Sequence, residues 1–415
     1  MHFAHHLFDE RPQRTFLIMM RFKGLFMNNF AALSSNPCQN LSHMLVQTRH
    51  KTSGGSKPKK KVYYRVHELD KVMDLQKKPA VILQLKDIIE SQKNKCIFLR
   101  DLEKEVGFVQ KWNCMAAIEK YPTIFHVSGG DRAPVAVRLT DKAQRVAVEE
   151  DEARMLMEPI LVKNLRKLLM LTVDCKVPME KIDLIENELG LPLDYKKSLI
   201  PKYPEFFSVK EINGKAYLHL ENWNSSLGVT AREENLVREG ELKDGGRGKK
   251  VKISKDGNYP GPYAFRICYP AGFRPNTGFL EELERWQKTE FPSPYLNARR
   301  FNQADPKARK RIVAVLHELL SLTIEKRMTS FQMSAFQSEL LLPARLILCL
   351  IKHHGIFYIT NKGVRSTVFL KEAYDGSNLI QKYPILKFKA KFVALSGRKD
   401  SSFADGISHN YRDLH

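Results

Sequence analysis

The apolar residues of residues 178–220 first follow the spacing of a short helix. Three of them fall at i, i+3 and i+7, on one helical face: Ile182, Ile185 and Leu189. Gly190 follows where a helix often ends in a left-handed residue. The pattern predicts a helix that ends at Gly190 and a second helical stretch over residues 194–202.

The second half of this stretch has the pattern of a β-hairpin. Residues 206–220 contain two apolar runs separated by Asn213-Gly214. A type I′ turn needs positive φ at both central residues, which Asn and Gly adopt readily. We therefore predict two strands joined at this dipeptide.

The same order of helix end, hairpin entry and later strand occurs three times in the chain, which indicates an internal repeat. The ends of the second helices align at residues 105–109, 188–192 and 339–343. The segments that enter the hairpins align at residues 121–125, 203–207 and 353–357, and the later strands at residues 135–139, 216–220 and 367–370. Glu105 to Glu188 is a step of 188 − 105 = 83 residues, and Glu188 to Glu339 is a step of 339 − 188 = 151. The longer step implies an insertion between the second and third copies.

Each copy also follows an apolar-periodic helix, expected over residues 79–91, 158–171 and 306–327. In the last of these, Asp305 suits the N-cap, Pro306 suits the first helical position, and Lys326-Arg327 suit the C-terminal end. Three helices followed by a hairpin is the order of a winged helix. The predicted fold is α+β and mainly helical, with three winged-helix-like modules at about residues 62–145, 155–222 and 301–375 and an insertion at 224–300.

The charge balance indicates a polyanionic partner. The 415 residues carry 68 Lys and Arg against 46 Asp and Glu, a formal net charge of +22. A basic protein whose charge only keeps it soluble is the alternative. The chain contains no phosphate-binding glycine loop, nucleophile elbow or H-E-x-x-H motif. We therefore expect no enzyme activity and no cofactor.

The N-terminal segment differs from the rest of the chain. Residues 11–67 contain eleven Lys and Arg but no Asp or Glu. This composition is typical of an organelle transit peptide, predicted over residues 1–55 with its linker. A secretory signal is the rival interpretation, but no small-residue cleavage site directly follows the apolar run, which is also too short to span a bilayer.

The cysteine usage favours a reducing compartment. The six cysteines form no C-x-x-C motif and no Cys/His set at zinc spacing. His353-His354 is an adjacent pair, but no matching carboxylate or Cys motif accompanies it. We therefore predict no metal site.

The insertion begins with a polar, Gly-rich stretch over residues 231–255, interpreted as a mobile linker. Residues 259–275 then combine aromatic residues with Arg266 and Arg274. These rings could stack on bases beside Arg, or could clamp an irregular segment against a module, which we favour. A helix is expected over residues 279–286, and a flexible tail over residues 396–415.

Basic residues recur where a winged helix presents its third helix to nucleic acid. Copy one has Lys111 and Lys120, with Trp112 as a further candidate; copy two has Lys196, Lys197 and Lys202; and copy three has Arg345 and Lys352. The linker adds Lys57, Lys59, Lys60 and Lys61, which would bind phosphate by counterion release. Because surface helices often carry lysine, these residues are candidates for RNA binding and no more.

Four blocks of the chain together resemble the plant organelle RNA recognition (PORR) domain family. They lie at residues 60–107, 118–125, 314–326 and 342–374, and the last, which includes H-H-G-I-F-Y at residues 353–358, is the most specific. The family pattern commonly has Pro where this chain has His354. The resemblance covers residues 60–395 and provides no catalytic motif to transfer.

The resemblance implies an RNA-binding protein of mitochondria or chloroplasts that promotes splicing of group II introns. We expect residues 56–395 to be the RNA-binding domain, intron-containing organellar RNA and other splicing factors to be partners, and mitochondria to be the compartment, with chloroplasts as the alternative. A basic protein-interaction scaffold of an organellar ribonucleoprotein is the alternative function.

Overall fold

The computed structural model describes residues 65–106, 114–130, 133–239, 257–259, 261–270, 272–302 and 304–397. The chain divides into two compact units. Among the described residues, one unit contains residues 82–143 and the other contains residues 65–81 and 144–397. The predicted transit peptide, the Lys57 to Lys61 tract and nearly all of the predicted tail lie outside the described residues.

The first unit contains a three-stranded antiparallel sheet, the first sheet, with strand order β1-β3-β2. Helix α3 (Lys77–Glu90) precedes it; the other elements are β1 (Cys96–Phe98), α4 (Leu99–Val106), α5 (Cys114–Glu119), β2 (Phe125–Gly130) and β3 (Ala133–Leu139). Its inner face is apolar and closed, because Ile97, Leu102, Ile118 and Val137 are all buried. Helices α4 and α5 lie between β1 and β2 in the sequence, so the hairpin β2–β3 comes last.

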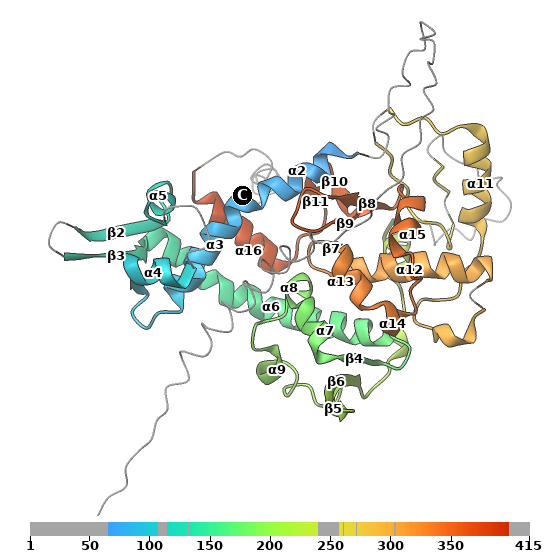
Figure 1. Ribbon diagram of the computed structural model, residues 1–415, viewed down its shortest axis with the longest axis horizontal. Coiled ribbons are helices and arrows are strands. Elements are labelled where there is room, and N and C mark those ends of the chain that lie inside the picture. The colour runs from blue at the N-terminus through green and yellow to red at the C-terminus, as the bar shows by residue number, and fades with distance from the viewer. Residues whose placement is uncertain are drawn as a thin grey trace, which may run out of the picture. The chain divides into compact units, whose positions relative to one another are not determined.

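The second unit contains the second sheet, with strand order β4-β6-β5 (Figure 1). Its elements are α6 (Asp141–Leu171), β4 (Lys176–Pro178), α7 (Met179–Leu184), α8 (Glu186–Leu189), α9 (Tyr195–Ser198), β5 (Phe207–Ile212) and β6 (Lys215–Leu220). Gly190 ends α8 with φ 77°, as expected from its place after the apolar positions. The predicted turn is confirmed, since Asn213 has φ 53° and Gly214 has φ 72° between β5 and β6.

The third sheet, also in the second unit, has strand order β7-β9-β8. Its elements are α12 (Pro306–Leu322), β7 (Arg327–Thr329), α13 (Ser330–Ala335), α14 (Gln337–Leu340), α15 (Leu346–Lys352), β8 (Phe357–Thr360) and β9 (Thr367–Leu370). The Asp305 side chain accepts a hydrogen bond from the backbone N–H of Lys307 at 2.8 Å, as expected of an N-cap. Strand β8 begins at Phe357 even though His354 departs from the resembled family.

The prediction for the end of α12 is wrong. Lys326-Arg327 do not continue this helix, because it ends at Leu322 and Lys326 turns the chain with φ 53°. Arg327 then starts β7, which pairs with β9. Lys95 and Cys175 have similar positive φ values of 49° and 50° directly before β1 and β4. Sequence patterning missed these three strands because each is only three residues long, and each sheet therefore has one strand more than the predicted hairpin.

The insertion is more ordered than predicted at its start. Residues 231–239 form helix α10 (Ala231–Glu239) instead of a linker, and residues 240–256 lie outside the described part. Leu236 is buried, and the buried guanidinium of Arg232 donates to the carbonyl oxygen of Ala264 at 3.0 Å. The predicted helix over residues 279–286 is found as α11 (Thr277–Lys288). The short 3-10 helices of the insertion are η1 (Ser225–Leu227) and η2 (Ala298–Arg300).

The second and third repeats contact each other through reciprocal backbone bonds. The N–H of Val173 donates to the carbonyl of Glu339 at 2.9 Å, and the N–H of Ile324 donates to the carbonyl of Glu188 at 2.8 Å. The two donors are separated by the same step as the two acceptors, since 324 − 173 and 339 − 188 both equal 151. Lys181 adds an ion pair of 2.6 Å to Glu339. One apolar core runs through both repeats, so they form a joined pair.

Helix α2 (His67–Leu75) packs on the third sheet, although its residues fall in the range predicted for module one. Leu69 and Val72 are buried against Tyr358 and Phe369. Beyond β9 the chain forms η3 (Lys371–Ala373), β10 (Tyr374–Asp375), β11 (Asn378–Leu379) and α16 (Pro384–Ala394). In the described ranges, no helix combines the length and apolarity that a bilayer span needs. The chain is thus mixed α and β, with small antiparallel sheets.

Candidate nucleic-acid interface

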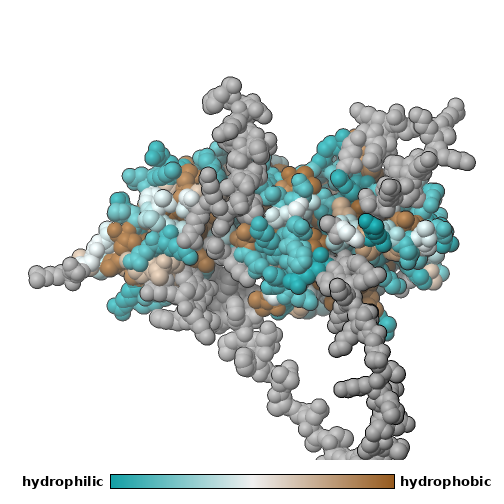
Figure 2. All heavy atoms as spheres, turned by 90° about the horizontal axis from the view of Figure 1, so that it is seen from above, coloured by the Kyte–Doolittle hydropathy of each residue, from teal (hydrophilic) through white to brown (hydrophobic). Residues whose placement is uncertain are grey.

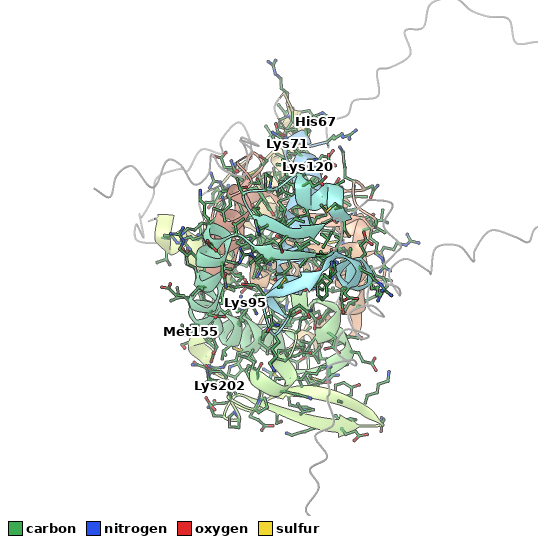
Figure 3. All side chains as sticks on the ribbon, turned by 90° about the vertical axis from the view of Figure 1, so that its left-hand side faces the viewer. His67, Lys71, Lys95, Lys120, Met155 and Lys202 are labelled. Atoms are coloured by element: carbon green, nitrogen blue, oxygen red, sulfur yellow. The ribbon has the colours of Figure 1, made fainter. Side chains whose placement is uncertain are left out.

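The short helix α9 holds two of the predicted lysines at the surface. Its position is fixed by Tyr195, which is fully buried and donates its hydroxyl to Asp183 at 2.7 Å. Lys196 and Lys197 follow directly and are exposed. Lys202 lies beyond the helix, near the base of the hairpin β5–β6, and is also exposed (Figure 3). The second repeat therefore presents all three predicted cations to solvent.

Two of these lysines are neutralised within the chain. Lys196 Nζ lies 2.7 Å from a carboxylate oxygen of Asp183, and Lys202 Nζ lies 2.5 Å from one of Glu158. The hydrogen bond to Glu158 raises the pKa of Lys202. Exposed ion pairs are weak, so an RNA phosphate could displace the carboxylates. Breaking each ion pair would offset part of the free energy gained from the phosphate contact. Lys197 has no ion pair with any residue that the structure describes, and it is the most available cation of the set.

The adjoining hairpin adds cations that the sequence interpretation missed. Lys210 lies on β5 and Lys215 begins β6, and both are exposed. Lys210 pairs with Glu221 at 2.7 Å. The alternation of side chains along residues 208–212 is the sequence signal that places Lys210 on the outer face of the strand.

The candidates in the first unit are only partly described. Lys111 and Trp112 lie outside the described residues. Lys120 directly follows α5 and is exposed (Figure 3). The first sheet nearby exposes His126 and Arg138, which are opposite each other on β2 and β3. This unit therefore offers a cation, Arg138, on its hairpin as well as Lys120 near its third helix.

The third repeat differs in character. Arg345 and Lys352 are exposed at the two ends of α15, but the solvent side between them is apolar. Ile347, Leu348 and Ile351 are 46%, 50% and 51% exposed. The exposed cations of this helix thus bracket an aliphatic surface instead of forming a basic one.

A position-by-position comparison shows how the two helices differ. The N–H groups of Leu348 and Cys349 bond to the carbonyl of Arg345, as those of Lys197 and Ser198 bond to the carbonyl of Asp194. The step of 151 residues therefore places Leu348 where the second repeat has Lys197, and Ile347 where it has Lys196. Figure 1 shows α9 and α15 well apart in the second unit, with α7 and α12 between them. The two helices present different chemistry on different parts of the unit.

The aromatic residues of the insertion are used inside the fold. Tyr269 stacks on Phe273 with ring centroids 4.4 Å apart, and both rings pack against His354. Gly355 allows the insertion to approach the third repeat closely, because a Cβ at this position would lie 2.3 Å from a methyl carbon of Ile267. The structure therefore shows the clamp against the third repeat. Arg266 and Arg274 lie in the same segment and are exposed.

Burial controls the protonation of the adjacent histidine. The ring of His353 packs against that of Trp286, with ring centroids 4.8 Å apart and an interplanar angle of 34°. Burial, assisted by the charge of Lys352, lowers the pKa of His353 to about 4. This imidazole is therefore neutral near pH 7 and contributes packing, not positive charge.

A family model for the plant organelle RNA recognition domain matches residues 64–401. The chain belongs to the plant organelle RNA recognition domain family. The resemblance seen in the four sequence blocks is thus confirmed over most of the chain. The match includes all three sheets and the insertion.

Relatives of this PORR chain include What's This Factor proteins. The Arabidopsis thaliana protein WHAT'S THIS FACTOR 1 homolog, chloroplastic, is 30% identical over 84% of this chain and 66% of its own length. The Arabidopsis protein ROOT PRIMORDIUM DEFECTIVE 1 is 31% identical over 86% of this chain and 88% of its own length. WHAT'S THIS FACTOR 9, mitochondrial, is 23% identical over 76% and 78%.

The chain spans slightly less than two thirds of the What's This Factor 1 relatives. What's This Factor 1 is named as chloroplastic and What's This Factor 9 as mitochondrial, so the relatives' names alone do not assign this PORR chain to one compartment. No solved structure matches it.

Proposed function

We propose that this chain is a non-enzymatic RNA-binding protein of mitochondria that promotes splicing of group II introns. The observation that carries the proposal is the basic surface of the second repeat, formed by α9 and the hairpin β5–β6, in a chain that belongs to the plant organelle RNA recognition family. Lys197 and Lys215 are exposed there without an ion pair among the described residues. Such cations bind phosphate by releasing its counterions.

We further propose that the three repeats are winged-helix modules. Each has a helix, a short strand, two or more short helices and a hairpin, and each sheet orders its strands first-third-second. In a winged helix, the third helix and the hairpin are the usual nucleic-acid contacts. In the second repeat these two elements hold the exposed lysines, which supports the assignment of RNA binding to this repeat.

Affinity for RNA is the first test. Residues 56–415 should bind a group II intron RNA more tightly than a neutral control protein does at about 0.1 M salt, and binding should weaken steeply as salt rises. Equal binding by the control protein would remove the proposal. Sequencing the RNA that co-purifies with the tagged full chain would show whether introns are selected, and loss of spliced transcript in a depleted line would show the effect on splicing.

The basic tract of residues 57–61 is the main competitor for this site. If Lys57, Lys59, Lys60 and Lys61 supply most of the affinity, deleting residues 1–61 should abolish binding, while changes on α9 should have little effect. We expect instead that the deletion retains RNA binding and that changes on α9 weaken it. A fluorescent fusion of residues 1–60 tests the compartment, because import into chloroplasts would replace the mitochondrial assignment without changing the RNA proposal.

The exposed aliphatic surface of α15 favours a second candidate function, a scaffold that binds proteins of an organellar ribonucleoprotein. Half-exposed Ile347, Leu348 and Ile351 form this surface, between Arg345 and Lys352. Exposed apolar patches of this kind often mark protein contacts. If RNA binding is absent but α15 changes abolish co-purification of splicing proteins, the scaffold function is the correct one.

A further inference from the structure

The side of each sheet that faces away from its own helices differs among the three repeats. In the third sheet, this outer face includes Tyr358 and Phe369, which are paired across β8 and β9. Both rings are buried, because Leu69 and Val72 of α2 cover them. The outer face of the third sheet is therefore occupied by a segment of the chain itself.

The outer face of the first sheet is open. Ile97 and Val137 point inward and are buried, so their neighbours in the strands point outward. One of these, Phe98, is 50% exposed at the edge strand β1. Its cross-strand partner is Ala136, which is too short to cover the ring. A phenyl ring thus lies on an accessible sheet surface.

Polar residues that suit RNA flank this ring. Arg138 is two residues from Ala136 on β3, diagonal to Phe98, and diagonal neighbours lie within reach of long side chains. His126 is directly opposite Arg138 on β2. Both are exposed, and neither has a side-chain partner among the described residues. The face offers an aromatic surface, a cation and an imidazole side by side.

The outer face of the second sheet repeats this combination. Tyr217 on β6 is half-buried, and Lys176 Nζ lies 5.8 Å from the centroid of its ring. His219 supports the tyrosine edge-on, with ring centroids 6.5 Å apart. Lys210 is opposite Tyr217 on β5. A single exposed aromatic residue needs no explanation, but the recurrence of ring and cation on both open faces does.

We propose that the open outer faces of the first and second sheets bind unstacked bases of single-stranded RNA. Phe98 and Tyr217 would stack on bases, while Arg138 and Lys176 would hold the neighbouring phosphates. Sheets that carry aromatic rings beside basic residues recognise single strands in this way, because every base has a π-face. This inference rests on the proposed RNA-binding function and specifies the form of RNA that is bound.

The test compares three ligands and matched variants of the full chain. The ligands are a 12-nucleotide single-stranded RNA, the same strand with abasic sites, and its duplex. Wild type should prefer the intact single strand. Phe98→Leu should weaken single-strand binding by roughly 5- to 150-fold, the loss expected for one stacked base, without changing the salt dependence, because no phosphate contact is lost.

Two variants separate stacking from folding effects. Phe98→Trp retains a π-face and should keep wild-type affinity, whereas Phe98→Leu keeps apolar area without one. Phe331→Leu is the control outside the sheet faces, because Phe331 on α13 is 51% exposed and packs under the guanidinium of Arg365, 4.0 Å from its ring centroid. Its affinity for RNA should be unchanged. Tyr217→Leu should repeat the effect of Phe98→Leu in the second sheet.

The outcomes distinguish this inference from the proposed function. If wild type binds RNA but treats the single strand, the abasic strand and the duplex alike, the stacking inference is wrong and RNA binding stands. Unchanged affinity in both Phe98→Leu and Tyr217→Leu would also overturn it. Should no RNA bind to the wild type at all, the proposed function and the inference fail together.

Discussion

Replacing Asp70 by Ala should release α2 from the third sheet. Asp70 is 4% exposed and accepts hydrogen bonds from the hydroxyls of Tyr358 at 2.8 Å and Thr360 at 2.5 Å. Arg65, just before α2, adds an ion pair to Asp70 at 2.8 Å. The carboxylate is thus the polar anchor at the centre of an otherwise apolar contact.

The magnitude follows from what the substitution leaves behind. Asp70→Ala leaves the hydroxyls of Tyr358 and Thr360 buried without their acceptor, at a cost of about 1–3 kcal/mol each. Arg65 adds little to this cost, because its side chain is 49% exposed and stays solvated after the substitution. We expect the docking of α2 to weaken by about 3 kcal/mol, which is roughly a hundredfold in its docking equilibrium.

The same carboxylate predicts the pH dependence of docking. Burial alone would raise the pKa of Asp70, but hydrogen bonds from Thr360, Arg65 and Tyr358 lower it below its usual value. A group with a lowered folded-state pKa stabilises the fold above its unfolded pKa, and this stabilisation is lost as pH falls through the folded pKa. Docking of α2 should therefore persist at neutral pH and weaken below about pH 4.

Amide hydrogen exchange over residues 67–75 measures this effect directly. In Asp70→Ala, exchange of the α2 amides should accelerate by roughly a hundredfold, while the amides of α12 should change little. Asp74→Ala is the matched control, because Asp74 lies on the same helix but pairs with Lys362 at 2.8 Å on the surface. Equal protection of α2 in Asp70→Ala and wild type would refute the reasoning.

Three further changes test other parts of the structure. Gly214→Val should lower the free energy of unfolding, measured by heat or urea, by about 1 kcal/mol. The cost comes from the backbone, because φ is 72° there, and not from a clash, because an added Cβ would meet no atom within 4 Å. An unchanged free energy of unfolding would contradict the positive-φ turn at this residue. Lys197→Ala should lower the slope of log affinity against log salt by about 0.7, and Lys196→Ala by less, because Lys196 is already paired; the reverse ranking would contradict the α9 surface. Ile347→Lys with Leu348→Lys should leave the fold stable but abolish any protein contact of α15, and unchanged co-purification of partners would exclude that surface.

The sequence predicted the parts of the fold that local chemistry determines. Asn213-Gly214 and Gly190 were placed correctly, because positive φ is restricted to few residue types and is visible in the sequence. The N-cap at Asp305 has the same basis. The strands β1, β4 and β7 were missed, because three residues are too few for an alternating pattern. Leu341 adopts φ 49° where the second repeat has Gly190, which only tertiary packing can enforce.

The candidate site was less predictable than the fold. Exposure of Lys196 and Lys197 followed from their place on a short helix, but the ion pairs of Lys196 and Lys202 did not follow from the sequence. Asp183 is 13 residues from Lys196 in sequence and lies on α7, and Glu158, the partner of Lys202, lies on α6. Such pairs depend on how helices are arranged in space. Sequence patterning gives the position of a cation on its own element but not which carboxylate on another element reaches it.

The joined repeats explain how one fold supports two surface chemistries. Val173 and Ile324 donate to the carbonyls of Glu339 and Glu188 in reciprocal bonds, so the same edge of each repeat is used in the contact. The third helices are not part of these bonds, and each keeps its own solvent side. Substitutions there do not disturb the shared core, because buried positions such as Tyr195 and Leu346 anchor the helices independently of Lys197 and Leu348. The second repeat can therefore present lysines at its surface while the third presents aliphatic side chains, with no change in how the pair is held together.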